Sequence, residues 1–289
     1  MKEFIAEKPQ TLKEFTDNTY AQGSFFWNYL IRNKEIKING KKTGENVFLA
    51  AGDKVAYYLP SEKEKKSAFY PVYEDENVLV IDKESGVNSE AVFAALSRER
   101  KCFFIHRLDR NTAGLLIFAL RTEAAVWLEK AFRERRVEKI YHALCFGLFE
   151  KDGERLTAYL KKDEEKARVH IFGGPVAGAE KIVTEYEVLK REKEYTKVKI
   201  VLHTGRTHQI RAHLAYLGKP VLGDIKYGNR KMNERTGTKT QALCAVRITF
   251  GDIPAENTLH YLSGKVVKLK DPQILKQFDA LDKTKPANE

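Results

Sequence analysis

Short apolar segments bounded by turn-forming or charged residues recur along this chain, and they constrain its fold more than any other feature of the sequence. Each segment is far shorter than the roughly 20 apolar residues that a membrane-spanning helix needs. Runs of this length that are rich in valine, isoleucine, leucine and phenylalanine are typical of buried or half-buried strands. The sequence therefore predicts strands of a common core at 78–81, 115–120, 198–202 and 245–250.

Two stretches between these strands have the periodicity of amphipathic helices. Residues 122–138 carry an apolar stripe after a threonine suited to capping, and their predicted end is rich in arginine. A shorter helix is expected to start at Thr207 and to stop at Gly218, just before Pro220. Strands separated by irregular stretches, with only a few helices, predict an α+β fold.

The composition excludes several classes of protein. The chain has 289 residues, of which 43% are apolar and 11% aromatic, so it can bury a substantial core and is not expected to be disordered. The first ten residues lack the apolar stretch of a signal peptide, which favours a cytoplasmic protein. The three cysteines are odd in number and share no C-x-x-C spacing, so we expect buried free thiols.

The first sixty residues are predicted to form a small unit of their own. A helix is expected near 25–31, and the alternating segment 36–38 breaks at Asn39-Gly40, a strong hairpin signal. Two further short strands are expected around Gly52-Asp53. Residues 61–69 are highly charged and are predicted to be a linker to a second unit at 70–270, and residues 271–289 to be a polar tail.

The positive charge is concentrated in two segments. The net charge is +11, and residues 98–139 (11 Lys and Arg, 6 Asp and Glu) contribute +5, whereas residues 203–247 (9 and 2) contribute +7, which leaves −1 for the rest. Such concentration predicts a surface that binds a polyanion, although a basic face kept for solubility is the alternative. The candidate side chains for binding this polyanion are Arg32, Lys34, Arg107, Arg110, Arg133, Arg136, Arg206 and His208.

The first basic segment contains the string His106-Arg-Leu-Asp-Arg-Asn-Thr-Ala-Gly114, directly before the apolar run at 115–120. Asp109 stands between two arginines, and adjacent positive charge favours an ionised carboxylate. This is the state that a nucleophile or a general base requires. A structural ion pair at the corner of a loop is the alternative interpretation.

The second basic segment contains Arg206, His208 and Arg211 around the start of the predicted short helix. The free N–H groups of a helix start attract anions, and Arg211 is expected to be available to a carboxylate from elsewhere in the chain. A metal site is not predicted. His208 and His213 are five residues apart, which is not the spacing that places two ligands on one helical face.

These two strings, HRLDRNTAGLLIFA and GRTHQIRAHLAYLGKPVLGDIKYG, resemble the signatures of RluA-type pseudouridine synthases. Weaker matches at Lys139-Ile140-Tyr141 and in segment 184–188 extend the resemblance from about residue 73 to residue 250. In the N-terminal unit, the residues around Asn39-Gly40 and Gly52-Asp53 resemble the S4 RNA-binding module. The resemblance implies a mixed, largely antiparallel sheet with flanking helices and a central cleft, preceded by a small S4-like α/β module.

The resemblance also implies an isomerase that converts uridine in ribosomal or transfer RNA to pseudouridine, without cofactor or metal. Asp109 matches the catalytic aspartate, which either adds to the sugar or removes a ribose proton. Arg211 matches the arginine that pairs with this aspartate, and Tyr141 the tyrosine that stacks on the target base. Arg107 matches the residue that enters the base stack when the uridine is flipped out. A monomer is the default expectation.

Two other functions are compatible with parts of the pattern. A non-catalytic RNA-binding or ribosome-assembly protein could retain the same fold, but a carboxylate inside a cleft that attracts phosphate would then serve no purpose. A glycosidase needs two carboxylates at a suitable separation, and only Asp109 stands out near the two strings.

Overall fold

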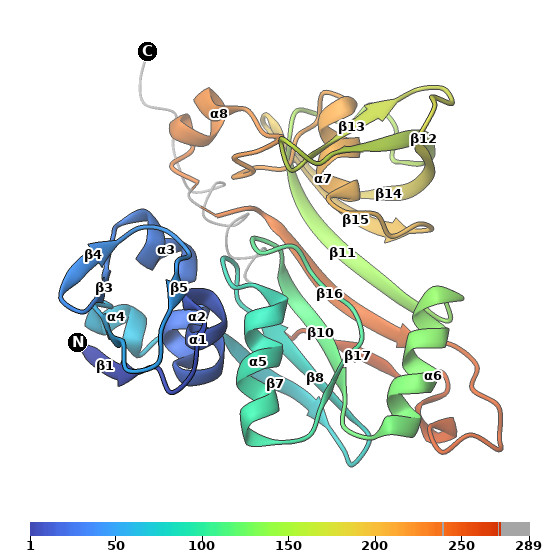
Figure 1. Ribbon diagram of the computed structural model, residues 1–289. Helices are drawn as coiled ribbons and strands as arrows, with labels where there is room; N and C mark the ends of the chain where they lie inside the picture. Colours follow the sequence, from blue (N-terminus) through green and yellow to red (C-terminus); the bar gives the residue numbers. More distant parts are fainter. Residues whose placement is uncertain (239, 271, 273–289) are drawn as a thin grey trace.

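A large mixed β-sheet forms the body of the protein in a computed structural model that describes residues 1–238, 240–270 and 272 (Figure 1). The predicted polar tail, 271–289, lies outside the described residues except for Pro272. Neighbouring strands of the sheet run antiparallel, except that β10 and β16 pair in parallel. The α+β prediction with a mixed, largely antiparallel sheet is therefore confirmed. The strands are β7 (Phe69–Glu74), β8 (Val78–Lys83), β9 (Phe103–Phe104), β10 (Ala113–Ala119), β11 (Val137–Phe146), β12 (Gly153–Asp163), β13 (Arg168–Phe172), β14 (Glu180–Glu192), β15 (Tyr195–Leu202), β16 (Leu243–Phe250) and β17 (Val266–Lys268).

The sheet order, β13-β12-β14-β15-β11-β16-β10-β8-β7, places β10 near one end between two layers of helix. Leu116 and Phe118 pack with α5 (Ser89–Glu99) on one face, whereas Leu115 and Ile117 pack with α6 (Thr122–Arg133) on the other. Because successive side chains of a strand point to opposite faces, a strand covered on both faces has to be apolar at every position. The continuous apolar run that the sequence shows is thereby explained.

The helix predicted for 122–138 ends earlier, at Arg133. Arg135 adopts a left-handed conformation (φ 60°), and the N–H of Arg136 donates to the carbonyl of Ala131 at 2.8 Å, which closes the last turn. Val137 is already a buried residue of β11, paired with Phe250. Burial of this strand residue outweighs the good helix propensity of the preceding arginines, so the prediction was wrong at its C-terminal end.

The second predicted helix is α7 (Gln209–Tyr216), which begins two residues after Thr207. Its N-cap residue, His208, has a left-handed backbone (φ 55°) and makes no side-chain capping bond. Gly218 (φ 72°) follows the helix as predicted. The remaining helices of this part of the chain are α8 (Arg230–Arg235) and the short 3-10 turn η1 (His260–Leu262).

The N-terminal residues form a small sheet with its own hydrophobic core, which includes Leu12, Leu30 and Tyr57. Asn39 and Gly40 both have positive φ (50° and 82°), as a two-residue hairpin turn requires, so the predicted hairpin is confirmed. The helix expected at 25–31 is divided at Phe26. The elements are β1 (Lys2–Ile5), β2 (Gln10–Thr11), α1 (Leu12–Thr19), α2 (Ala21–Phe25), α3 (Trp27–Arg32), β3 (Ile36–Ile38), β4 (Lys41–Thr43), β5 (Phe48–Leu49) and β6 (Lys54–Tyr57).

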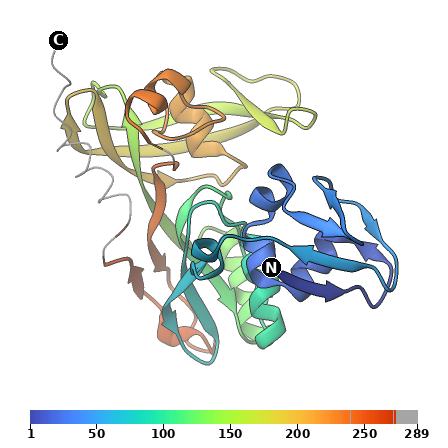
Figure 2. The same ribbon diagram turned by 90° about the vertical axis from the view of Figure 1, so that its left-hand side faces the viewer.

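Helices α1 and α2 of the N-terminal part lie against α5 of the larger part, as both views of the ribbon show (Figures 1 and 2). Phe25 belongs to the same buried cluster as residues of α5 and packs edge-on against Phe69. The charged segment 61–69 contains the short helix α4 (Ser61–Glu64), and the amide of Gln22 donates to the carbonyls of Lys63 and Glu64 at 2.8 and 2.7 Å. The connecting segment is therefore held by the N-terminal helices.

Two smaller expectations concern the cysteines and membranes. Cys102, Cys145 and Cys244 are buried and unpaired, as predicted. Within the described part of the chain, no helix combines the length and the apolar character that crossing a membrane requires.

Candidate active site

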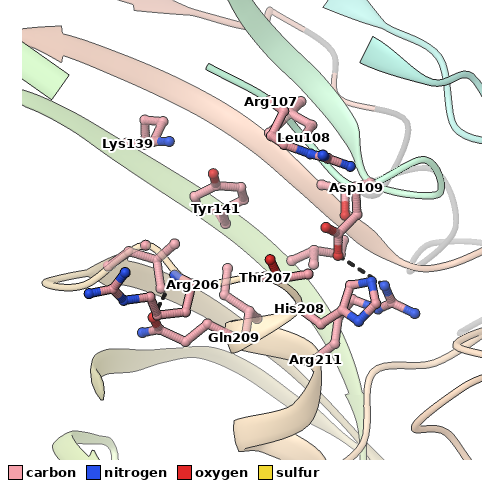
Figure 3. Close-up of a pocket in the computed structure, with 15 residues that line it drawn as sticks. Arg107, Leu108, Asp109, Lys139, Tyr141, Arg206, Thr207, His208, Gln209 and Arg211 are labelled. Carbon is pink, nitrogen blue, oxygen red and sulfur yellow. Dashed lines mark hydrogen bonds and ion pairs between the residues drawn. The ribbon is translucent and has the colours of Figure 1, made fainter. Parts of the chain in front are cut away.

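A cavity of about 180 Å³ lies where three distant segments meet: the loop before β10, strand β11, and the segment that leads into α7. Arg107 and Asp109 come from the first segment, Lys139 and Tyr141 from the second, and Arg206, His208 and Arg211 from the third (Figure 3). Tyr141 lies between Lys139 and Asp109 in this view. The fold thus brings the two basic strings of the sequence to opposite walls of one cavity.

Asp109 and Arg211 form the ion pair that the sequence predicted. Nη1 of Arg211 donates to Oδ2 of Asp109 at 2.9 Å. The side chain of Arg211 is 6% exposed, whereas that of Asp109 is 20% exposed and faces the cavity. Burial opposes the charge of Arg211, but its hydrogen bonds to two carboxylates outweigh burial and raise its pKa. The arginine is therefore a fixed cation that orients Asp109.

The second carboxylate is Asp224, to which the sequence assigned no role. Its oxygens accept from Nε and Nη2 of Arg211 at 2.7 and 3.1 Å. They also accept from the backbone N–H groups of Lys226 and Tyr227 at 2.8 and 3.0 Å. Burial opposes ionisation of Asp224, but Arg211 and these N–H groups outweigh it and lower its pKa. The signal in the sequence was the string Gly223-Asp224, noted only as part of a motif.

Tyr227 is a further member of this network and contacts both Arg211 and His208. Its ring centroid lies 5.2 Å from the guanidinium carbon of Arg211, and its hydroxyl is 2.9 Å from Nδ1 of His208. The same hydroxyl accepts from the N–H of Val169 at 2.9 Å. Gly228 follows directly, and a Cβ there would lie 2.0 Å from the carbonyl oxygen of Asp224. Only glycine fits this close approach, which explains the Tyr-Gly pair at the end of the second string.

Tyr141 lies on β11 and is buried beside the cavity. The pairing of β11 with β16 shifts register between Ile140 and Tyr141, and such irregularities redirect side chains near functional sites. Burial, and then the charge of Asp109, raise the pKa of the Tyr141 hydroxyl above its ordinary value. Tyr141 is therefore a neutral phenol at physiological pH, with its ring available to the cavity.

Lys139 was noted in the sequence only as part of a short string, but it lines the cavity beside Tyr141. Its Nζ lies 5.2 Å from the centroid of the Phe132 ring, which in turn stacks on His106 at 4.4 Å. Burial lowers the pKa of Lys139 to about 8. The sequence contained one signal for this position. Lys139 is two residues from Tyr141, and residues i and i+2 of a strand share a face.

The predicted RNA-binding residues fall into three groups. Arg107, Arg206 and His208 line the cavity. Arg107 pairs with Glu90 at 3.1 Å, Arg206 pairs with Glu180, and burial lowers the pKa of His208.

Arg133 lines a neighbouring groove of about 440 Å³, together with Arg135, and this groove shares Lys139, Gly205 and Arg206 with the cavity. Arg136 does not line it. The guanidinium of Arg136 pairs with Glu134 at 2.7 Å and lies 5.6 Å from the Trp127 ring.

The third group lies toward the N-terminal sheet. Arg110 lines a separate cavity next to α3, on the other side of the loop from Asp109. Arg32 and Lys34 are exposed at the end of α3. Burial, and the positive charges of Arg211 and Arg32, lower the pKa of Arg110. Neither Arg32 nor Lys34 is among the described residues that line the two cavities.

These residues suit a reaction in which one oriented carboxylate faces a planar group bound in the cavity. Among the described residues that line the cavity, Asp109 is the only carboxylate, since Asp224 lies behind Arg211. This disfavours a glycosidase, which needs two carboxylates flanking the substrate. The part of the chain that the structure describes also has no group of three or more His, Cys, Asp and Glu residues that could hold a metal ion.

Comparison with known proteins agrees with this geometry. The sequence model of the RNA pseudouridylate synthase family matches residues 77–216. Ribosomal large subunit pseudouridine synthase C of Vibrio cholerae serotype O1 (strain ATCC 39315 / El Tor Inaba N16961) is 30% identical, with 89% of this chain and 87% of the relative covered. Ribosomal large subunit pseudouridine synthase D of Pasteurella multocida (strain Pm70) is 33% identical over 55% of this chain and 52% of the relative.

Among solved structures, Human RNA Pseudouridylate Synthase Domain Containing 1 superposes with a TM-score of 0.58 at 26% identity, covering 76% of this chain and 97% of that one. The chain thus belongs to the family of RluA-type RNA pseudouridine synthases, isomerases that act on uridine in RNA.

Proposed function

We propose that this protein converts uridine to pseudouridine in the RNA of the large ribosomal subunit, with Asp109 as the catalytic carboxylate. Three relatives that match 72–89% of this chain carry names that specify the large subunit, which supports ribosomal over transfer RNA. The observation that carries the proposal is the chain Asp224–Arg211–Asp109, which orients one partly exposed carboxylate toward a cavity beside Tyr141.

In this proposal the target uridine leaves the RNA stack and its base enters the cavity, a step common to enzymes that act on bases. Arg107, which is exposed at the rim, takes the place of the base in the stack. Tyr141 packs on the uracil ring, and its raised pKa favours this role over proton removal in the free enzyme.

Asp109 starts the cleavage of the C1′–N1 bond, either by adding to the sugar or by removing a ribose proton. The detached uracil turns within the cavity and C5 bonds to C1′, as the carboxylate of Asp109 leaves the sugar or returns the ribose proton that it had removed. The proton from C5 is lost and N1 gains one, so the product is an isomer of the substrate. An enclosed cavity serves this reaction because the free base must stay bound between the two steps.

The chain is proposed to be organised as an S4-like RNA-binding module (1–60), a linker (61–69), the catalytic domain (70–270) and a polar tail (271–289). In this proposal Arg32 and Lys34 of the module bind the RNA around the target, together with Arg133 of the groove. We propose further that the protein works as a monomer in the cytoplasm. The separate hydrophobic core of the N-terminal sheet supports this division.

The test uses large-subunit ribosomal RNA transcribed in vitro, and hence free of modification, with pseudouridine mapped at single-nucleotide resolution. We expect wild-type protein to modify a defined uridine and Asp109→Asn to leave no detectable product. Asp152→Asn, at an exposed aspartate that also pairs with an arginine, is the matched control and should act like wild type. Equal product from Asp109→Asn and wild type would contradict the assignment of the carboxylate.

A further inference from the structure

A second cavity, of about 170 Å³, lies between helices α2 and α3 of the N-terminal part and the turn that follows β8. Phe26, Asn28 and Tyr29 line one wall, and Ser85 and Arg110 line the other. We refer to this space as the junction cavity. It is similar in volume to the cavity beside Asp109, so it has room for a group of about the size of one nucleobase.

The junction cavity and the catalytic cavity lie on the two sides of one loop. Asp109 faces the catalytic cavity, and Arg110, the next residue, faces the junction cavity. The carbonyl of Arg110 accepts from the N–H of Gly86 at 2.9 Å, and the carbonyl of Asn111 accepts from the hydroxyl of Ser85 at 2.8 Å. Because neighbouring Cα atoms are only about 3.8 Å apart, the two cavities are separated by little more than the width of this loop.

Arg110 is a half-buried cation whose guanidinium has neither a carboxylate nor a hydrogen bond among the residues that the structure describes. The charged groups that act on it most are two more cations, Arg211 and Arg32. Arg211 is already satisfied by two carboxylates, whereas Arg110 is not. A half-buried guanidinium with no carboxylate beside it attracts an anion supplied from outside, and solvent screens that attraction less than at a fully exposed site.

The opposite wall has the character of a surface on which bases stack. The rings of Phe26 and Tyr29 lie side by side on α2–α3, with Nζ of Lys63 5.5 and 5.0 Å from their centroids. One carboxylate, Glu84, also lines the cavity, but Lys66 pairs with it at 3.1 Å. Aromatic rings next to an unpaired arginine are a combination that binds single-stranded nucleic acid.

We infer that the junction cavity is a second nucleotide-binding site, which holds a single-stranded ribonucleotide close to the target uridine. Its base packs against Phe26 and Tyr29, and its phosphate pairs with the guanidinium of Arg110. The inference rests on the proposed function, because it assumes that RNA occupies the catalytic cavity. It also gives the N-terminal part a defined task, since neither wall alone forms the site.

The test measures RNA affinity in the Asp109→Asn background, so that its outcome is independent of turnover. The probe is an unmodified large-subunit ribosomal RNA transcript that contains 4-thiouridine, for binding and for photocrosslinking. Asn28→Glu places a negative charge at the exposed mouth of the cavity, and Asn18→Glu places the same charge on an exposed position of α1 that lines neither cavity. Tyr29→Ala removes the ring, whereas Tyr29→Phe keeps it.

We expect Asn28→Glu and Tyr29→Ala to weaken RNA binding by about tenfold or more, the size of one lost stacking contact. Asn18→Glu and Tyr29→Phe should stay within about twofold of the background protein. Crosslinks should map to the α2–α3 peptide and disappear with Asn28→Glu. Equal affinities for Asn28→Glu and Asn18→Glu, with crosslinks unchanged, would overturn the inference even if pseudouridine forms normally.

Failure of the proposed function gives a different result. In that case wild-type protein forms no pseudouridine on the transcript, while the binding comparison still decides whether the junction cavity holds a nucleotide. If Tyr29→Ala proves unfolded by circular dichroism, Asn28→Glu decides the question, because Asn28 is exposed and glutamate is a good helix former.

Discussion

At the scale of single residues, the site depends on one buried guanidinium that serves two carboxylates. Asp224 uses both of its oxygens on Arg211, and Asp109 receives the remaining nitrogen. A planar, five-donor fork can satisfy this geometry, whereas a lysine ammonium cannot. The catalytic carboxylate is therefore oriented by a residue that is itself held from behind.

Asp224→Asn should separate orientation from binding, because Asp224 is buried behind Arg211 and does not line the cavity. The amide cannot accept two guanidinium bonds, so Arg211 loses its fixed position. We expect kcat to fall by about a hundredfold with KM for RNA little changed, and the protein to lose about 3–5 kcal/mol of stability. Steady-state kinetics and urea unfolding check this, with Asp152→Asn as the control. A rise in KM with constant kcat would show that Asp224 acts on binding instead.

The lowered pKa of Lys139 predicts that RNA binding depends on pH. Its pKa is lowered to about 8 by burial, so the side chain is charged below that pH and neutral above it. If its ammonium contacts RNA, affinity should fall by up to about tenfold as pH rises from 7 to 9, the size expected of one hydrogen bond to a charged group. Lys139→Gln should bind more weakly at pH 7 and lose this pH dependence, whereas Lys41→Gln, on the exposed hairpin, should retain it. An identical pH profile for Lys139→Gln and wild type contradicts the assignment.

For single residues, the sequence indicated which side chains form a pair only where both belong to a recognisable string, and it gave no such indication elsewhere. Asp109 and Arg211 were both singled out, and their pairing came from the resemblance. Asp224 stood in the same second string, yet nothing local indicates that its carboxylate turns back to an arginine thirteen residues earlier. Lys139 was overlooked because burial, rather than any neighbour in sequence, gives it an unusual pKa.

At the scale of elements, the sequence did not reveal where the arginine-rich turn between α6 and β11 lies in the molecule. Because the helix ends at Arg133, the following arginines form a turn beside the groove that continues the catalytic cavity. Arg133 and Arg135 face this groove, whereas Arg136 is engaged by Glu134 and Trp127. Three arginines that look equivalent in the sequence therefore differ in role.

Reversing the charge of the groove arginines should identify the path of the RNA. We expect the double variant Arg133→Glu, Arg135→Glu to bind RNA more weakly and to reduce the slope of log K against log salt by about 1, since fewer counterions are released. Filter binding at several salt concentrations measures both. The variant Arg98→Glu, Lys101→Glu makes the same change in net charge at exposed positions that line neither cavity and should keep the wild-type slope.

The elements themselves were predictable wherever burial follows a simple pattern. The strands predicted at 78–81, 115–120, 198–202 and 245–250 are all present. A short apolar run between turn residues can be buried in few ways other than as a strand. Element ends were less predictable. Arginine and glutamate are good helix formers, and only the pairing of Val137 with Phe250 across the sheet ends α6 where it does.

At the scale of the whole molecule, the N-terminal sheet is joined to the larger part through buried apolar contacts. Phe25 packs in the same cluster as Leu79 and Leu96, and Gln22 holds the connecting segment. An interface of this kind restricts movement between the two parts, and the junction cavity depends on it. The segment 61–69 between the two parts accepts hydrogen bonds from Gln22 at the carbonyls of Lys63 and Glu64.

Phe25→Ala should uncouple the two parts. We expect a loss of about 3–5 kcal/mol, as for other buried phenylalanines, and an earlier, separate unfolding step of the N-terminal residues. Differential scanning calorimetry with hydrogen exchange of β6 and β10 measures this. Phe48→Ala, at a phenylalanine of β5 in the N-terminal part that is 70% exposed, should leave a single transition. A single transition for Phe25→Ala as well would mean that other contacts carry the interface.

The sequence by itself determined the fold class, the principal strands, the concentration of positive charge and the two strings that identify the family. These depend on local periodicity, composition and order, which a linear chain displays directly. Only the tertiary structure decided that Asp224 holds Arg211, that Arg133 and Arg136 have different surroundings, and that Asp109 and Arg110 face two different cavities. Each of these depends on contacts between residues far apart in the chain, such as Arg211 and Asp109, and such contacts exist only once the sheet has brought the segments together.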